Sequence, residues 1–553
     1  MHIENSIKNL LKKVLPKDVE IKLEVPPNKE LGDYAFPCYQ LAPKLKKPPE
    51  EIAKLYAKKL QKIAPKLISK IEANFAYINF FINPTEFAKN VISSVLKQKE
   101  KYGSINIGKK KKLLIEHTSI NPNAPPHVGR ARNALIGDSL ARLLRFVNYS
   151  VDVHYFVNDV GKQIAMLVYA CKNKKQLSFE KMLEYYIEIN KNLTPQIEKE
   201  IFDLLYKLEQ GDKKVKGQFK KIVDICLKGQ LKILSELSIR YDHFDYESKY
   251  LWARKTKEIL KQLEKTNKLT IDSHGRYVLD LRDFRLDMKD PVLVLTRADG
   301  TSLYSLRDIA YTIEKLEKAK ENMVVLGEDH KLYFQQIASA LSLLNYHAPR
   351  AVFYSHVLLK TGKMSTREGN LVLLQDFMKQ AIEKANQEFK KRGNYSKKAI
   401  KTLAYASVKY AILKVSPEKN VIFDWKQALS YEGDAAPYLL YSYARASSII
   451  KKAPKLRTRA DFNYLNSEAE KELIKEIYNF PSIVKEAASH LKPSIVANYA
   501  YELAKKFNEF YQVCRCIVEN KQEMAARLAL VEAFRYTIKN ALLLLGIKTL
   551  ERM

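Results

Sequence analysis

The sequence predicts an α/β protein in which a doubly wound parallel sheet follows an α+β module and precedes an all-helical region. Between residues 106 and 430, short apolar runs alternate with helical repeats, as in a parallel sheet whose strands are joined by helices. Strand signals fade beyond residue 431, where helical repeats continue. We therefore expect three domains, at residues 1–105, 106–430 and 431–553.

The composition predicts a soluble, cytoplasmic protein. At 553 residues the chain exceeds one ordinary domain, and 46% hydrophobic residues supply a large core. No apolar run is long enough to span a bilayer. The first residues, MHIENSIKNLLKKVL, lack the continuous apolar stretch of a signal peptide. We expect no association with a membrane.

The charge balance favours a polyanionic partner. Lys and Arg total 95 against 62 Asp and Glu, which gives a net charge of +33. Any single lysine run is equally well explained as a solvated surface. The 33 tyrosines favour nucleic acid, because aromatic rings stack on unpaired bases while cations hold the phosphates.

The cysteines suggest no structural role beyond packing. There are five, at positions 38, 171, 226, 514 and 516. Cys514 and Cys516 lack a second cysteine or histidine pair at metal-binding spacing, so we expect reduced thiols and no structural zinc.

Residues 1–105 predict the α+β module. Apolar residues recur at helical spacing near the start and over residues 49–63, whereas residues 76–82, AYINFFI, have the aromatic and β-branched character of a strand. Pro84 ends that strand.

The centre of the chain is organised around residues 113–132, which read LLIEHTSINPNAPPHVGRAR. The apolar start predicts a buried strand, the prolines break it, and helical spacing over residues 131–149 predicts a helix. His127, Gly129 and Arg130 then lie at or beside the helix N-terminus. Free backbone N–H groups and the helix dipole favour an anion there.

A second strand is expected at residues 149–157, so that strand, helix and strand form a right-handed parallel unit. Residues 164–239 are helical and highly charged, and we interpret about 164–269 as an insertion between two halves of this domain. Strands are expected again at residues 270–281, 292–296 and 323–326.

Beyond residue 431 the chain predicts an all-helical domain. Pro493 and Ser494 make a typical helix start, and an apolar stripe at helical spacing follows them. No internal repeat or low-complexity linker is evident.

A cationic segment, KMSTREGN at residues 363–370, follows the apolar run at 357–359. A His-x-Gly-Arg tetrapeptide alone is weak evidence, because histidines near helix starts are often only caps. The two segments together resemble the two nucleotide-binding signatures of class I aminoacyl-tRNA synthetases. Their surroundings, and the segments ELGDYAFP, PYLLYSYAR and LLLGIKTLERM, are similar to the arginyl-tRNA synthetase family over essentially the whole chain.

The resemblance implies a Rossmann-type catalytic domain that activates an amino acid with ATP, through positioning and electrostatics rather than a covalent nucleophile. Mg²⁺ would accompany the nucleotide. The residues expected to act on ATP are His127, Gly129, Arg130, Lys363, Met364, Ser365 and Arg367. The family's second signature histidine is Arg130 here, its second loop lysine is Thr366, and a lysine that some members carry before the first signature is Ala124. The identity of the cationic residue that contacts the pyrophosphate is therefore left open.

The resemblance also implies a pocket for L-arginine. Carboxylates suit a guanidinium, which presents several donors and a fixed charge. Tyr304 and Asp308 are four residues apart and would share a helical face. The full set of matching positions is Glu116, Asn121, Glu247, Tyr304, Asp308 and His330.

For tRNA, the resemblance implies contacts in both flanking domains. Asn74, Tyr77 and Asn79 match positions that meet the D-loop, and Tyr438, Tyr441, Arg445, Tyr511 and Met553 match positions around the anticodon loop. From the residues alone, Tyr77 packed inward in a hairpin is slightly favoured, and the resemblance reverses that order. For each C-terminal tyrosine, packing in a helical bundle stays an open alternative.

The sequence thus predicts an arginine-tRNA ligase that acts on tRNA(Arg), L-arginine and ATP, and a monomer is expected. Two alternatives stay open: a class I synthetase for another amino acid, and an RNA-binding paralogue without catalysis. Neither a Walker A motif nor a Gly-x-Gly-x-x-Gly fingerprint is present, which argues against a P-loop NTPase or a dinucleotide enzyme.

Overall fold

The computed structural model describes residues 3–252, 254–359, 372–391 and 395–553. The chain divides into two compact units. Unit 1 contains residues 1–102, 446–478 and 505–537, and unit 2 contains residues 103–445, 479–504 and 538–553. The N-terminal module therefore shares its unit with part of the C-terminal helices.

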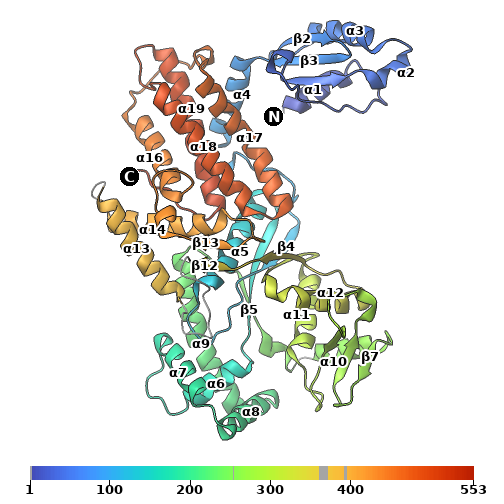
Figure 1. The fold of residues 1–553 in the computed structure, drawn as a ribbon, viewed down its shortest axis with the longest axis vertical. Coiled ribbons are helices and arrows are strands. Elements are labelled where there is room, and N and C mark those ends of the chain that lie inside the picture. The colour runs from blue at the N-terminus through green and yellow to red at the C-terminus, as the bar shows by residue number, and fades with distance from the viewer. Residues whose placement is uncertain (1–2, 253, 360–371, 392–394) are drawn as a thin grey trace. The chain divides into compact units, whose positions relative to one another are not determined.

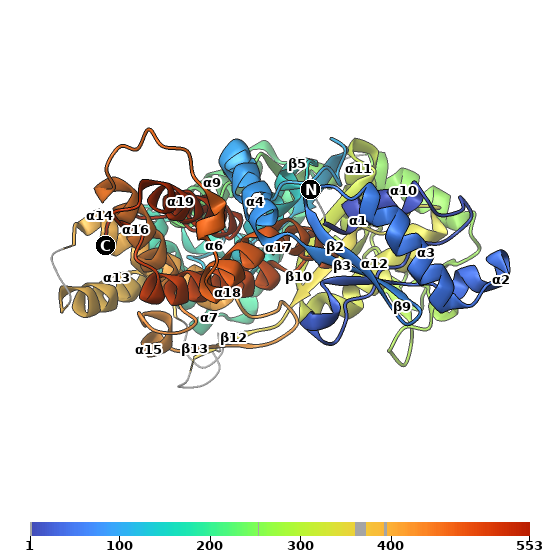
Figure 2. The same cartoon turned by 90° about the horizontal axis from the view of Figure 1, so that it is seen from above.

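The N-terminal module of unit 1 is an antiparallel sheet covered by helices. Its strands are β1 (Tyr34–Pro37), β2 (Ile68–Asn74) and β3 (Tyr77–Ile82), in the order β1-β3-β2. Ile78 and Phe80 are fully buried in a core shared with α1 (Ile3–Lys12) and α3 (Pro49–Lys62), and Figure 2 shows α3 beside β2 and β3. The predicted helices and strand are confirmed, and α4 (Pro84–Gln98) follows, capped by the Asn83 side chain.

The centre of unit 2 is a parallel sheet of five strands in the order β11-β10-β4-β5-β6, of which β4 and β5 are labelled in Figure 1. The strands are β4 (Lys112–Glu116), β5 (Ser150–Val157), β6 (His243–Tyr246), β10 (Glu321–Gly327) and β11 (Arg350–Tyr354). Helix α5 (Val128–Phe146) connects β4 to β5, as the sequence predicts. The doubly wound parallel sheet is confirmed.

Four helices follow β5, namely α6 (Lys162–Ala170), α7 (Phe179–Lys191), α8 (Pro195–Glu209) and α9 (Lys213–Glu236). They confirm the helical character predicted for residues 164–239. The chain then returns to the sheet as β6, which pairs with β5 in parallel. The range 164–269 expected to be an insertion therefore contains a strand of the central sheet.

A second sheet in unit 2 is antiparallel and separate from the first. It consists of β7 (Leu269–Ile271), β8 (Tyr277–Asp280) and β9 (Val292–Val294), so the strands expected there exist but do not extend the parallel sheet. Its residues share a core with α10 (Arg254–Glu264), α11 (Tyr304–Lys318) and α12 (Lys331–Leu343). The short strands β12 (Val357–Leu359) and β13 (Val421–Phe423) pair in parallel.

From residue 431 onward the described chain is helical, as predicted, with α16 (Ala436–Lys452), α17 (Glu468–His490), α18 (Pro493–Val513) and α19 (Lys521–Leu544). Before it, within the range 106–430, lie α13 (Leu374–Lys390), α14 (Lys397–Leu413) and α15 (Trp425–Ala428). Helix α18 starts at the predicted Pro493. Within the described ranges, no helix has the length and apolar character needed to cross a bilayer.

Candidate active site and tRNA-contact residues

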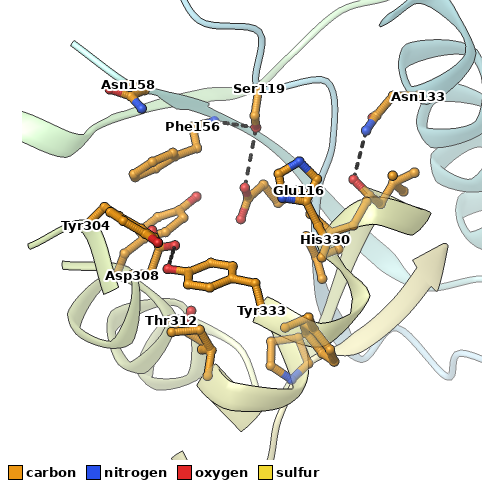
Figure 3. Close-up of a pocket in the computed structure, with 18 of the residues that line it drawn as sticks. Glu116, Ser119, Asn133, Phe156, Asn158, Tyr304, Asp308, Thr312, His330 and Tyr333 are labelled. Carbon is orange, nitrogen blue, oxygen red and sulfur yellow. Dashed lines mark hydrogen bonds between the residues drawn. The ribbon is translucent and has the colours of Figure 1, made fainter. Parts of the chain in front are cut away.

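A cavity of about 670 Å³ lies at the carboxyl ends of β4, β5 and β10. Glu116 ends β4, Phe156 and Asn158 lie at the end of β5, and Gly327 ends β10, and all four border the cavity. Helices α11 and α12 supply the opposite wall (Figure 3). Ligands of open parallel sheets bind at this edge, so the topology alone makes the cavity the main candidate site.

The first signature forms the turn from β4 into α5. His127 is the N-cap residue of α5 with extended backbone, and its side chain makes no capping hydrogen bond, so it lies at the positive end of the helix dipole. Two N–H groups of this turn are already used, because that of Arg130 donates to the His127 carbonyl and that of Val128 to the Val372 carbonyl. Burial, together with the positive charge of Arg130, lowers the pKa of the His127 imidazole to about 4. His127 is therefore neutral near pH 7 and can act as a hydrogen-bond donor but not as a cation. Arg130 borders the cavity and supplies positive charge.

Gly129 is needed in this turn for steric reasons. A Cβ atom at position 129 would lie 3.0 Å from the His127 ring. Any side chain there would press on the imidazole, so glycine lets His127 keep its place at the start of the helix.

Asp308 lies on the cavity wall formed by α11. The Tyr333 hydroxyl donates a 2.6 Å hydrogen bond to its Oδ2 (Figure 3). Burial and the nearby carboxylate of Glu247 raise the pKa of Asp308 to about 7, although the bond from Tyr333 acts in the opposite direction. Among the described residues, Asp308 has no ion-pair partner. A ligand with a cationic group would stabilise the ionised form of the buried Asp308 carboxyl.

Two other predicted acids already pair with cations of α11. Lys315 donates to Glu116, and the Arg307 Nε donates a 2.7 Å hydrogen bond to the buried Glu247. Burial raises the pKa of Glu247, and the charge of Arg307 opposes this shift. These internal pairs leave Asp308 as the predicted acid best placed to receive a cation.

The other predicted arginine-binding residues divide into two groups. Tyr304 and His330 border the cavity with Asp308, and the Tyr304 and Tyr333 rings lie 5.3 Å apart. Asn121 does not border it. Its side-chain amide instead donates a 3.1 Å hydrogen bond to the Gln163 side chain. The shared helical face of Tyr304 and Asp308 is confirmed.

The second signature, residues 363–370, lies outside the described residues. The roles expected for Lys363, Met364, Ser365 and Arg367 stay predictions, as does the substitution at Thr366. The described chain resumes at residue 372, where the Val372 carbonyl accepts a 3.1 Å hydrogen bond from the Val128 N–H. The chain that follows the second signature thus contacts the first turn of α5.

In unit 1, the predicted D-loop residues share one face of the sheet. Asn74 pairs with Tyr77 across β2 and β3, and Asn79 follows on the same face because side chains alternate along a strand. Ile78 and Phe80 occupy the opposite, core face. Tyr77 is therefore not packed inward into that core. It lies half-buried beside Tyr39, with ring centroids 5.8 Å apart.

The predicted anticodon residues of unit 2 lie on or near α16. Tyr441 is 38% exposed, and the Arg445 guanidinium lies 4.6 Å from the centre of its ring. The Tyr438 ring is 5.9 Å from that of Tyr501, and Met553 is half-buried. In unit 1, Tyr511 on α18 is 43% exposed. Surface placement leaves the rings of Tyr441 and Tyr511 able to stack on bases.

Sequence reasoning missed Lys315 and Tyr333, which border the cavity, and Arg307, which pairs with the cavity residue Glu247. The signal for Lys315 was present, because it lies seven residues after Asp308 and thus on the same helical face. Tyr333 follows His330, the N-cap residue of α12, by three residues, which also places the two near each other at the start of that helix. Arg307 had no comparable signal, since its partner Glu247 is distant in sequence.

Side chains able to bind a metal gather once in the described chain, at Asp152, His154 and His243. Their ligand atoms lie within 4.8 Å of one another. Asp152 already pairs with Lys112 at 3.2 Å, and His154 with Asp245 at 2.5 Å. None of these residues borders the cavity, so this group is separate from the candidate active site.

Family models match nearly the whole chain. Residues 1–82 match the arginyl tRNA synthetase N terminal domain, and residues 91–425 match the catalytic domain of class I tRNA synthetases (R). Residues 439–553 match the DALR anticodon binding domain.

Relatives and solved structures agree with the family models. An arginine–tRNA ligase of Methanocaldococcus jannaschii is 38% identical and aligns over 100% of this chain and 99% of its own, and one of Methanopyrus kandleri is 36% identical, over 100% and 97%. Thermus thermophilus arginyl-tRNA synthetase has a TM-score of 0.80 at 25% identity, covering 100% and 99% of the two chains. The Plasmodium falciparum enzyme shares the fold, with a TM-score of 0.76 at 20% identity and coverage of 100% and 98%. The chain belongs to the arginyl-tRNA synthetase family of class I aminoacyl-tRNA synthetases.

Proposed function

We propose that this protein is an arginine-tRNA ligase. The arginine carboxylate attacks the α-phosphate of ATP, which forms arginyl-adenylate and releases pyrophosphate. A hydroxyl of the terminal ribose of tRNA(Arg) then takes the arginyl group and AMP leaves. The observation that carries the proposal is Asp308, a carboxyl without an ion-pair partner among the described residues, in a cavity at the nucleotide-binding edge of the sheet.

For ATP, the proposal assigns one wall of the site to the first turn of α5. The N–H groups of this turn and Arg130 offset phosphate charge, while neutral His127 donates a hydrogen bond. Lys363, Ser365 and Arg367 are proposed to act from the second signature. Mg²⁺ bound to the phosphates would share their charge.

For arginine, the proposal assigns the guanidinium to Asp308. Glu247, Tyr304 and His330 border the same cavity and would define its shape, while Asn121 is proposed for the α-amino group. A carboxylate beside a planar cation forms strong, directional hydrogen bonds. Lysine, with a single ammonium, would match this site less well.

For tRNA, the proposal assigns the D-loop to Asn74, Tyr77 and Asn79 and the anticodon loop to the C-terminal positions. The net charge of +33 would draw the polyanion to the protein. We further propose that the enzyme is a cytoplasmic monomer.

The arginine site is testable by thermal shift with arginine and with citrulline. Citrulline has nearly the same shape but no charge on its side chain. A ligand at about 100 times its Kd stabilises a protein by about 2.7 kcal/mol, so arginine should raise the melting temperature measurably. An equal effect from citrulline would contradict recognition through a carboxylate.

Arginine binding should depend on pH because the pKa of Asp308 is about 7. The guanidinium is charged throughout, but the carboxyl is neutral below this pKa and ionised above it. The arginine affinity should therefore level off above pH 7 and fall roughly tenfold by pH 6. Calorimetric titration from pH 6 to 8 measures this trend. The Asp308→Asn variant should bind weakly with no such slope.

Tyr441→Ala and Tyr511→Ala should each weaken tRNA charging. Loss of one stacked base costs about 1 to 3 kcal/mol, which raises the KM for tRNA roughly 5- to 150-fold. Tyr206, 58% exposed on α8, offers a matched control as Tyr206→Ala. If charging at limiting tRNA stays normal in both variants, these tyrosines serve packing and not anticodon recognition.

A further inference from the structure

Helix α9 places one glutamine beneath the turn between β4 and α5. Gln230 is fully buried. Its Nε2 donates hydrogen bonds to the main-chain carbonyls of Asn121 at 3.0 Å and Ala124 at 2.8 Å. Its Oε1 lies 3.2 Å from the Tyr155 hydroxyl of β5. One side chain thus joins α9, β5 and the turn that leads to His127.

The turn has few means of holding its own shape. Thr118 and Ser119 have φ values of +76° and +43°, a left-handed conformation that costs energy for residues with side chains. Pro122, Pro125 and Pro126 lack an N–H and so cannot donate backbone hydrogen bonds. Within the turn, the Asn123 N–H donates to the Asn121 carbonyl at 2.8 Å. Groups outside the turn, namely Gln163, Tyr155 and Gln230, supply further hydrogen bonds.

The chemistry of these groups requires an amide at position 230. The two carbonyls can only accept hydrogen bonds, so the NH₂ end of Gln230 must face them. The other end meets Tyr155, whose hydroxyl accepts a 3.1 Å bond from the Ile120 N–H and lies 3.0 Å from the Ile120 carbonyl. A hydrophobic residue would remove the Gln230 donor from the Ala124 carbonyl and leave the Asn121 carbonyl with the bond from the Asn123 N–H, while an ionised glutamate would repel both carbonyls.

We propose that Gln230 is a positioning residue for adenylate formation, acting through the backbone of residues 120–124. By fixing these carbonyls, it sets where Asn121 and the His127 end of α5 lie relative to the cavity. The helices between β5 and β6 are then part of the active-site support, because they carry Gln230 to the turn. This inference rests on the proposed arginine-activating function.

The test compares Gln230→Leu and Tyr155→Phe with Lys228→Ala, an exposed position on the same helix. Arginine-dependent ATP–pyrophosphate exchange, measured with tRNA present, gives kcat and KM, and the melting temperature reports folding. We expect kcat to fall roughly tenfold or more for Gln230→Leu at saturating substrates, because small misplacements of reacting groups slow reactions strongly. Lys228→Ala should match the wild type.

A glutamate variant separates positioning from general destabilisation. In Gln230→Glu, a protonated carboxyl can donate to one carbonyl, whereas the ionised form cannot, so exchange relative to wild type should recover as the pH is lowered. Faster hydrogen exchange of the amides in residues 119–124, with the rest of unit 2 unchanged, is the second expected sign.

The possible outcomes distinguish a failure of the role proposed for Gln230 from a failure of the proposed function. Wild-type kcat in folded Gln230→Leu would overturn the inference, as would a loss of activity that only tracks the unfolded fraction. Absence of arginine-dependent exchange in the wild-type protein would instead contradict the proposed function. Wild-type activity together with loss of kcat in the folded variant supports both.

Discussion

Replacing Asp308 by alanine is expected to abolish the use of arginine at ordinary substrate concentrations. Removing the carboxylate would leave the guanidinium in a partly enclosed cavity without its charged partner. Losses of about 3 kcal/mol are typical when one member of a buried charge pair is removed, which corresponds to roughly a hundredfold in affinity. The KM for arginine should rise by at least this factor.

ATP binding is expected to change little in Asp308→Ala, because the α5 turn that would hold the phosphates lacks contact with this carboxylate. Glu317→Gln is a suitable control, since it removes an exposed acid from the same helix. The variants are compared by calorimetry with arginine and with ATP separately. Unchanged arginine affinity in Asp308→Ala would refute the assignment.

Replacing Arg132 by methionine is expected to destabilise unit 2 and impair the active site together. Arg132 is fully buried in α5 and forms no ion pair with a carboxylate of the described residues, and burial lowers its pKa to about 10. Its guanidinium donates to the carbonyls of Ser355 at 2.6 Å, His356 at 3.2 Å and Ser416 at 2.9 Å. It therefore ties the helix of the first signature to the chain entering β12, which leads to the second.

Methionine fills much of the same space but removes all three hydrogen bonds. The Ser355 carbonyl then loses the Arg132 donor, whereas the His356 and Ser416 carbonyls keep bonds from the Val421 and Lys419 N–H groups. The expected loss is roughly 3 kcal/mol, with a drop in apparent melting temperature of about 5 °C or more. Arg145→Met removes a half-exposed arginine from the last turn of the same helix and should cost about 1 kcal/mol or less. Equal melting temperatures for the two variants would show that the Arg132 contacts contribute little.

Much of the fold is predictable because buried parallel strands are continuous apolar runs. Residues 113–115 and 323–326 illustrate this, and both lie in the central sheet. The strand β6 reads HFDY, and its mixed polarity at the sheet edge hides it from such a pattern. Residues 270–281 and 292–296 were expected as strands, but strand propensity does not specify pairing partners, so their separate antiparallel sheet could not be predicted.

The site residues were predictable where residue spacing or a sequence motif indicated them. Tyr304 and Asp308 share a helical face, and His127 begins the helix expected from the sequence. Arg307 and Gln230 could not be predicted because their partners are remote in sequence, and a lone arginine or glutamine in a helix gives no indication of what it contacts. Side chains that support a site through tertiary contacts become visible only in the folded chain.

The most direct test of the proposed function is aminoacylation with each standard amino acid separately, using ATP, Mg²⁺ and unfractionated tRNA. This assay measures amino-acid activation, amino-acid specificity and transfer to tRNA together. We predict that arginine alone is attached, to tRNA that is subsequently identified as tRNA(Arg), and that Asp308→Ala removes this product. Attachment of a different amino acid, or binding of tRNA with no aminoacylation at all, would contradict the proposal.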